Sequence, residues 1–105
     1  MDKHGPDLSF LDNYQIFLLG ENIQVSNYIT RAIIKLTGDI TPYMPHLSRA
    51  IENCGYNAGS KALAFRYQNM STVIIKDTIT ISGMRDKQSA AVFLEWLKEK
   101  IRTAG

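Results

Sequence analysis

The chain has 105 residues, of which 45% are hydrophobic and 21% are charged, and its formal net charge is +2. This composition fits one globular domain and excludes a disordered or fibrous chain, and so small a net charge does not by itself indicate a nucleic-acid-binding protein. No apolar run approaches the roughly 18 residues that a membrane-spanning helix needs, and residues 1–10 lack the basic start and apolar core of a signal peptide, so we expect a cytoplasmic protein.

Residues 1–13 predict a loosely ordered leader. They combine Gly5 and Pro6 with acidic and polar residues and show no sustained periodicity. Leu8, Phe10 and Leu11 are the leader side chains that can pack against the rest of the chain. Residues 14–105 are then expected to form a single domain.

The domain is predicted to begin with a strand over residues 14–19, which ends at Gly20. From Ile23 to Leu36 the apolar residues recur at helical spacing, with Arg31 and Lys35 on the opposite side. Gly38 follows as a stop signal. We therefore expect an amphipathic helix over residues 23–36.

A connection is predicted over residues 39–45, because Pro42 and Pro45 interrupt any regular element there. Residues 46–54 predict a second, shorter helix, since they place four residues on one stripe: Leu47, Ala50, Ile51 and Cys54. Residues 56–60 contain Asn57 and Gly59 and are predicted to be a loop.

Residues 61–83 contain three short segments in which larger apolar residues alternate with small or polar ones, over 62–68, 72–76 and 78–82. This period of two predicts three antiparallel strands, with turns at residues 68–71 and 76–77. The face predicted to be buried carries Leu63, Phe65, Tyr67, Val73, Ile75, Ile79 and Ile81. The face predicted to be open carries Ala62, Ala64, Arg66, Gln68, Thr72, Ile74, Lys76, Thr78, Thr80 and Ser82.

The last segment predicts the longest helix, with Asp86 as its N-cap and its end near Thr103. Val92 and Trp96 flank an apolar stripe at helical spacing, which consists of Ala90, Phe93, Leu94, Leu97 and Ile101. The whole order predicts an α+β two-layer sandwich, β-α-α-β-β-β-α. In it, a mainly antiparallel sheet of about four strands has its helices on one face.

This order of elements over residues 14–102 resembles the repeat unit of the TATA-box-binding protein (TBP) fold, which also occurs in small archaeal proteins. The segment ITISGMRDKQSAAVFLEWLKEKI is similar to the last strand and packing helix of such a TBP-like unit. The chain departs from it in having two helices in the first crossover. It also has one unit and only Phe17 as an open-face aromatic, so the resemblance does not imply that it kinks DNA.

A second resemblance is to the Alba family of archaeal chromatin proteins. It lies in FLLGENIQVSNYITRAI, which is similar to the strand, glycine and Asn-Tyr helix start of that family, and in LSRAIENC. The Pro42 and Pro45 connection replaces an expected strand, and Alba chains lack the long final helix. The resemblance implies an alternative fold.

The sequence favours neither catalysis nor a bound cofactor. An anion could lie at the turn formed by residues 20–22, but Glu21 would repel it and no phosphate-binding glycine motif occurs. Cys54 and His46 would be about 12 Å apart along one helix, beyond hydrogen-bond reach, so a structural cysteine is expected. A single cysteine and two histidines provide no zinc ligand set. We therefore expect no enzyme, no cofactor and no metal.

The predicted open face is the better candidate for function. Arg66 and Lys76 supply positive charge, and residues 22–76 carry six basic residues against two acidic ones. Hydrogen-bonding groups surround them: Gln68, Thr72, Thr78, Thr80 and Ser82. Such a face can follow the phosphate backbone of DNA or RNA, and nucleic-acid binding is the function that we predict.

Two alternatives use the same face. If Ile16 and Leu18 point into the core, then Phe17 and Leu19 lie on the open face together with Ile74, and this apolar set indicates a protein partner or a homo-oligomer. The face can also be merely solvated, with threonines that serve strand propensity.

Overall fold

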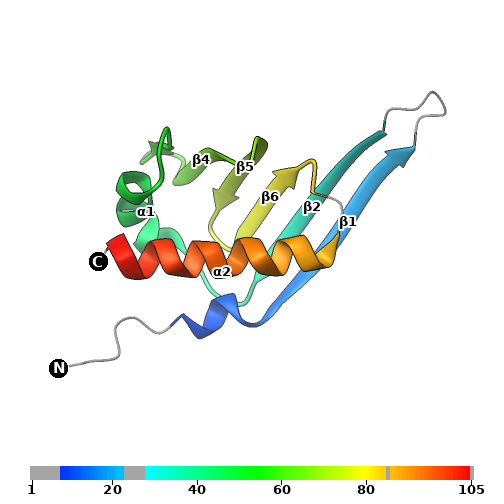
Figure 1. Ribbon diagram of the computed structural model, residues 1–105. Helices are drawn as coiled ribbons and strands as arrows, with labels where there is room; N and C mark the ends of the chain where they lie inside the picture. The colour runs from blue at the N-terminus through cyan, green and yellow to red at the C-terminus, as the bar shows by residue number, and fades with distance from the viewer. Residues whose placement is uncertain (1–7, 23–27, 85, 105) are drawn as a thin grey trace.

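Figure 1 shows the computed structural model of the protein, which describes residues 8–22, 28–84 and 86–104. Within these residues six strands form one sheet in the order β1-β2-β6-β5-β4-β3, and all neighbouring strands are antiparallel. The strands are β1 (Tyr14–Asn22), β2 (Tyr28–Leu36), β3 (Gly55–Asn57), β4 (Ala62–Tyr67), β5 (Met70–Ile75) and β6 (Thr78–Ser82). The helices are η1 (Ser9–Leu11), η2 (Thr41–Tyr43), α1 (Met44–Ala50) and α2 (Lys87–Ala104), of which η1 and η2 are short 3₁₀ turns.

The fold is a sheet-rich α+β fold, and the predicted four-stranded order β-α-α-β-β-β-α is wrong. The largest correction concerns the helix predicted over residues 23–36, because residues 28–36 form β2. The start of the predicted helix, residues 23–27, lies outside the described residues. In β2, Ala32, Ile34 and Leu36 are buried while Arg31 and Lys35 are exposed, which is the alternation of a strand.

A second correction concerns β3, which overlaps the start of the loop predicted over residues 56–60. Gly55 to Asn57 pair with β4, and the strand forms one edge of the sheet. The short second helix is confirmed, but it begins at Met44 rather than at residue 46 and ends at Ala50. Three residues of β3 carry too little side-chain pattern to predict a strand.

A third correction reverses the two faces of β5. Thr72 and Ile74 have no exposed surface and face the core, whereas Ile75 is 45% exposed. The reason is the turn before β5, which contains only Gln68 and Asn69 because Tyr67 pairs with Met70. A shift of one residue in a strand moves all its side chains to the other face.

The turn explains how the chain accepts this register. Gln68 and Asn69 both have positive φ angles, 51° and 68°, as the tight two-residue turns of β-hairpins require. The buried Thr72 hydroxyl donates a hydrogen bond to the Met70 carbonyl oxygen at 3.1 Å, so its polar atom has a partner in the core. The alternation predicted for β4 and β6 is confirmed, with Leu63, Phe65, Tyr67, Ile79 and Ile81 buried.

The final helix, α2, is confirmed and crosses one face of the sheet (Figure 1). Asp86 caps it, since its Oδ1 accepts a hydrogen bond from the Ser89 backbone N–H at 2.7 Å. The predicted stripe is buried: Ala90, Phe93, Leu94, Leu97 and Ile101. Trp96 packs against the core as a flank, but Val92 is 56% exposed. No helix in the described ranges has the length and hydropathy that crossing a membrane requires.

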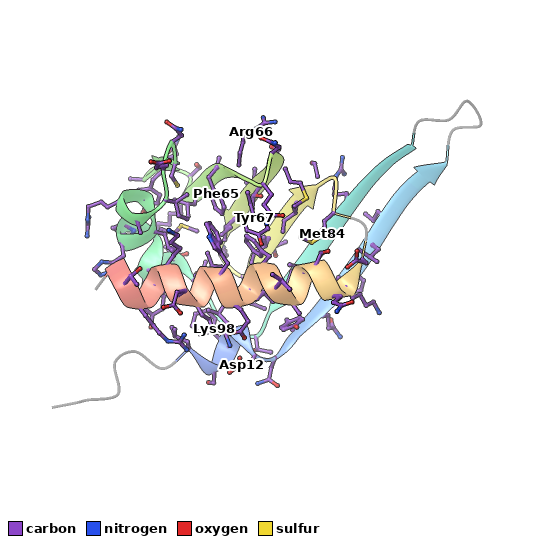
Figure 2. All side chains as sticks on the ribbon, in the orientation of Figure 1. Asp12, Phe65, Arg66, Tyr67, Met84 and Lys98 are labelled. Carbon is purple, nitrogen blue, oxygen red and sulfur yellow. The ribbon has the colours of Figure 1, made fainter. Side chains whose placement is uncertain are left out.

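An aromatic cluster joins α2 to β4. Phe65 and Tyr67 point from the sheet towards the helix, as Figure 2 shows, and pack against Phe93 and Trp96 with ring centroids 4.9–6.4 Å apart. Such aromatic pairs stabilise a core beyond the surface area that they bury. The cluster therefore fixes α2 over β4.

The residues before β1 are also packed on the domain. Leu8 and Leu11 are buried, and Lys98 of α2 contacts Asp12 at 2.5 Å and Glu95 at 2.8 Å (Figure 2). The side chain of Lys98 is only 9% exposed, whereas that of Asp12 is 57% exposed. The hydrogen bonds that Lys98 donates to Asp12 and to Glu95, of which the one to Asp12 has the larger effect, raise the pKa of Lys98 above its ordinary value.

Candidate binding face of the sheet

The side of the sheet away from α2, which we call the open face, carries no helix in the described part of the chain (Figure 1). In β2, β4, β5 and β6 the residues that point to it alternate with buried ones, and in β1 they are the residues that pair with open-face residues of β2. They are Gln15, Phe17 and Leu19 of β1; Arg31, Ile33 and Lys35 of β2; Thr78, Thr80 and Ser82 of β6; Ser71, Val73 and Ile75 of β5; and Ala62, Ala64 and Arg66 of β4.

The pairing registers arrange these residues in rows that run across the strands. The central row is mainly apolar and consists of Phe17, Ile33, Thr80, Val73 and Ala64. Phe17 is 49% exposed, although it is a large aromatic residue. Neighbouring strands are about 4.8 Å apart, so the row extends for ~19 Å over the five strands.

Polar and cationic rows border the central row on both sides. On one side the registers place Leu19, Arg31 and Ser82 in line, followed by Ser71 opposite Arg66. On the other side lie Gln15, Lys35, Thr78, Ile75 and Ala62. Residues two apart in a strand are separated by about 6.6 Å, so each border row is within reach of groups bound on the central row.

The charge of the open face is mainly positive. Arg31, Lys35 and Arg66 are exposed, and Figure 2 shows Arg66 pointing away from α2. Arg66 donates a hydrogen bond from Nη2 to the Asn69 carbonyl oxygen at 3.2 Å, which holds its guanidinium at the end of the hairpin. Asp77 offsets part of this charge through its 3.6 Å contact with Lys35.

A shallow hollow of about 220 Å³ opens at the end of β5 and β6. Val73, Ile75, Thr78 and Thr80 line it, together with Lys76 and Asp77 of the turn. The Thr78 hydroxyl donates to Asp77 Oδ1 at 3.0 Å, so this carboxylate is held on the turn. The lining of the hollow thus combines apolar side chains with polar and charged ones.

Some of the residues predicted for the site lie where expected. Arg66, Thr78 and Thr80 are on the open face, and so are Phe17 and Leu19, which are 49% and 50% exposed. Lys76 is exposed in the turn after β5. Its charge helps to lower the pKa of Asp39, although hydrogen bonds from Thr41 are the main cause.

Thr72 and Ile74 are corrections, because the register of β5 places both in the core. Gln68 is exposed in the β4–β5 turn, near the start of α2, and not in a row of the open face. The anion site considered at residues 20–22 is lost as well, since these residues belong to β1 and do not form the expected turn.

Arg31, Ile33 and Lys35 are site residues that sequence reasoning missed. The predicted helix has Arg31 and Lys35 on its outer side and Ile33 in its apolar stripe, whereas residues 28–36 form β2. The alternation of Arg31, Ile33 and Lys35 with Ala32, Ile34 and Leu36 is the signal that could have placed them on a sheet face.

The structure places no histidine beside Cys54 that could act as its general base, within the described residues. Cys54 is half-buried, and burial raises the pKa of its thiol, which favours the unreactive protonated form. His46 lies on α1, where its Nδ1 is 3.3 Å from Nη2 of Arg49.

Comparison with known proteins adds no relative to this picture. No protein-family model matches the chain, and no curated protein or solved structure is significantly similar to it. The resemblances to the TBP-like unit and to the Alba family therefore stay predictions.

Proposed function

We propose that this chain is a non-enzymatic module that binds single-stranded DNA or RNA on its open face. The observation that carries the proposal is the central apolar row, with the exposed Phe17 in it, between two rows that contain Arg31, Arg66 and Lys35. Proteins bind single strands in this way, by stacking bases on exposed aromatic rings while cations neutralise the phosphates.

The spacing of the cations supports a single strand in particular. Arg31 on β2 and Arg66 on β4 are separated by β6 and β5, which places their backbones ~14 Å apart. The hydroxyl groups of Ser82 and Ser71 lie between them and can donate hydrogen bonds to phosphate oxygens. An extended nucleic-acid strand that runs across the sheet along this row would meet Arg31 on β2 and Arg66 on β4, with the two serines between them.

The alternative is a protein partner or homo-oligomer on the same face, and the exposed apolar side chains favour it. Ile75 and Phe17 are nearly half exposed, and a face with this much apolar surface can be covered by another protein. The two functions respond differently to salt, because nucleic-acid affinity falls with ionic strength whereas an apolar contact does not.

The test is fluorescence anisotropy with short labelled single strands and duplexes of DNA and RNA at low salt. We expect the single strands to bind more tightly than the duplexes, and the double variant Arg31→Ala/Arg66→Ala to bind them at least tenfold more weakly. The matched control is Arg49→Ala/Arg102→Ala, which removes the same charge from the two helices. Equal losses in the two variants, or no binding by the unaltered protein, would overturn the proposal.

A further inference from the structure

The outer edge of β1 differs from the opposite edge of the sheet. Within the described residues β1 pairs only with β2, so one side of a nine-residue strand keeps its backbone groups unpaired. The opposite edge strand, β3, has three residues. A short edge strand is a common protection against pairing with another chain, and a long one is open to it.

Residues 14–19 of β1 lack the other usual protections, and Glu21 is the one charged residue of the strand. Residues 14–19 contain no charged residue and no proline, which are the groups that commonly block edge pairing. Phe17, Leu18 and Leu19 are 49%, 40% and 50% exposed, so both faces of the strand are apolar and uncovered here. Figure 1 shows the reason, since β1 and β2 run on as an arm beyond the N-terminal end of α2.

The strand is self-complementary in one register. Two copies related by a two-fold axis between their Leu18 residues would pair over all nine residues, because Leu18 is the middle residue of β1. On the open face Phe17 would lie opposite the partner's Leu19, and on the other face the two Leu18 side chains would meet. Since residues 14–19 carry no charge, two copies do not repel each other along this stretch.

A groove beside β1 leaves room for the second copy. Tyr14, Gln15, Ile16 and Phe17 line it on one side and Lys87, at the start of α2, on the other. Four of the five lining residues belong to β1, so a chain that pairs with this strand can place side chains in the groove.

We propose that this protein forms a two-fold dimer with a second copy of itself by antiparallel pairing of the two β1 edges, centred on Leu18. The two sheets then join into one continuous sheet, with both open faces on the same side. Nine residues per copy are fewer than the 20–30 that a standard interface contains, so the dimer forms reversibly and depends on protein concentration. This inference uses the edge of the sheet and does not depend on the proposed binding of nucleic acid.

The first test is sedimentation over a wide range of protein concentration, with the variants Leu18→Lys and Val92→Lys. We expect a monomer–dimer equilibrium that Leu18→Lys abolishes and that Val92→Lys leaves unchanged, because Val92 is also an exposed apolar residue but lies on α2. Leu18 does not point to the open face, so its replacement separates dimer formation from nucleic-acid binding. A protein that stays monomeric at every concentration would overturn the proposal.

The second test fixes the register. In a Cys54→Ser background, Leu18→Cys should cross-link two copies through a disulfide, since side chains directly opposite each other have their Cβ atoms about 5 Å apart. Val92→Cys in the same background should stay uncross-linked. A dimer in which Leu18→Cys fails to cross-link contradicts the pairing centred on Leu18.

Discussion

Thr72 is the residue at which the two possible registers of β5 can be told apart by experiment. It is fully buried, and its hydroxyl is hydrogen-bonded within the hairpin. Thr80 lies beside it on β6 but points to the open face. The same substitution should therefore be strongly destabilising at position 72 and tolerated at position 80.

We predict that Thr72→Lys lowers the free energy of unfolding by about 3 kcal/mol or more, because it buries an unpaired charge. Thr80→Lys should change it by less than about 1 kcal/mol, since the ammonium group can reach water. Urea denaturation of both variants measures the difference. If lysine is tolerated at 72 as well as at 80, β5 has the register expected from the sequence, in which both threonines lie on the open face.

Lys98 gives a second prediction at this scale, which concerns pH. The folded state holds the pKa of Lys98 above its ordinary value of 10.5, so its ion pairs contribute fully to stability below that pH. The contribution is lost as the pH rises through the raised pKa and the lysine deprotonates. Because Asp12 and Glu95 are largely exposed, we expect the contribution itself to be about 1 kcal/mol.

The measurement is the difference in unfolding free energy between the unaltered protein and Lys98→Met, followed from pH 8 to pH 11. We expect the difference to shrink towards the alkaline end. Lys87→Met is the control, since Lys87 is exposed and should give a difference that stays near zero. A difference in unfolding free energy between the unaltered protein and Lys98→Met that grows with pH would contradict a raised pKa for Lys98.

Among the elements, α2 carries the clearest stability prediction. Phe93 is fully buried in the aromatic cluster, so Phe93→Ala should cost about 3–5 kcal/mol. Trp96→Ala should cost less, because Trp96 is only partly buried, and Val92→Ala should fall within about 0.5 kcal/mol. Thermal or urea unfolding ranks the three variants, and a cost at Val92 equal to that at Phe93 would mean that the helix is rotated.

The elements also differ in how far the sequence predicts them. The helix α2 could be predicted because its N-cap, its apolar stripe and its length agree with one another. The strands β4 and β6 could be predicted because large apolar and small or polar side chains alternate without interruption. In each case the local pattern and the packing require the same structure.

The strand β2 could not be predicted because its apolar residues fit two periods. Ala32, Ile33 and Leu36 have helical spacing, whereas Ala32, Ile34 and Leu36 have strand spacing. Its position between β1 and β6 decides in favour of a strand, and these partners are distant in the sequence. The predicted open face therefore lacks Arg31 and Lys35. It also wrongly includes Thr72 and Ile74, for a separate reason, which is the register of β5.

For the molecule as a whole, the arrangement in rows assigns different parts of the binding energy to different residues. Cations that contact phosphates release counterions, so their contribution depends on salt. An aromatic ring that stacks on a base contributes by contact, so its share is much less sensitive to salt. The proposed face thus predicts two kinds of variant that differ in how affinity changes with ionic strength.

We predict that Arg31→Ala/Arg66→Ala reduces the slope of log K against log salt for a single-stranded oligonucleotide by ~1.4 units, because about 0.7 of a counterion is released per neutralised phosphate. Phe17→Ala should instead weaken binding by about 1–3 kcal/mol at every salt concentration and leave the slope unchanged. Anisotropy titrations at several salt concentrations measure both quantities on the same samples. If Phe17→Ala binds as tightly as the unaltered protein while the arginine variant loses slope, the strand contacts the border rows alone, and the central row does not stack on bases.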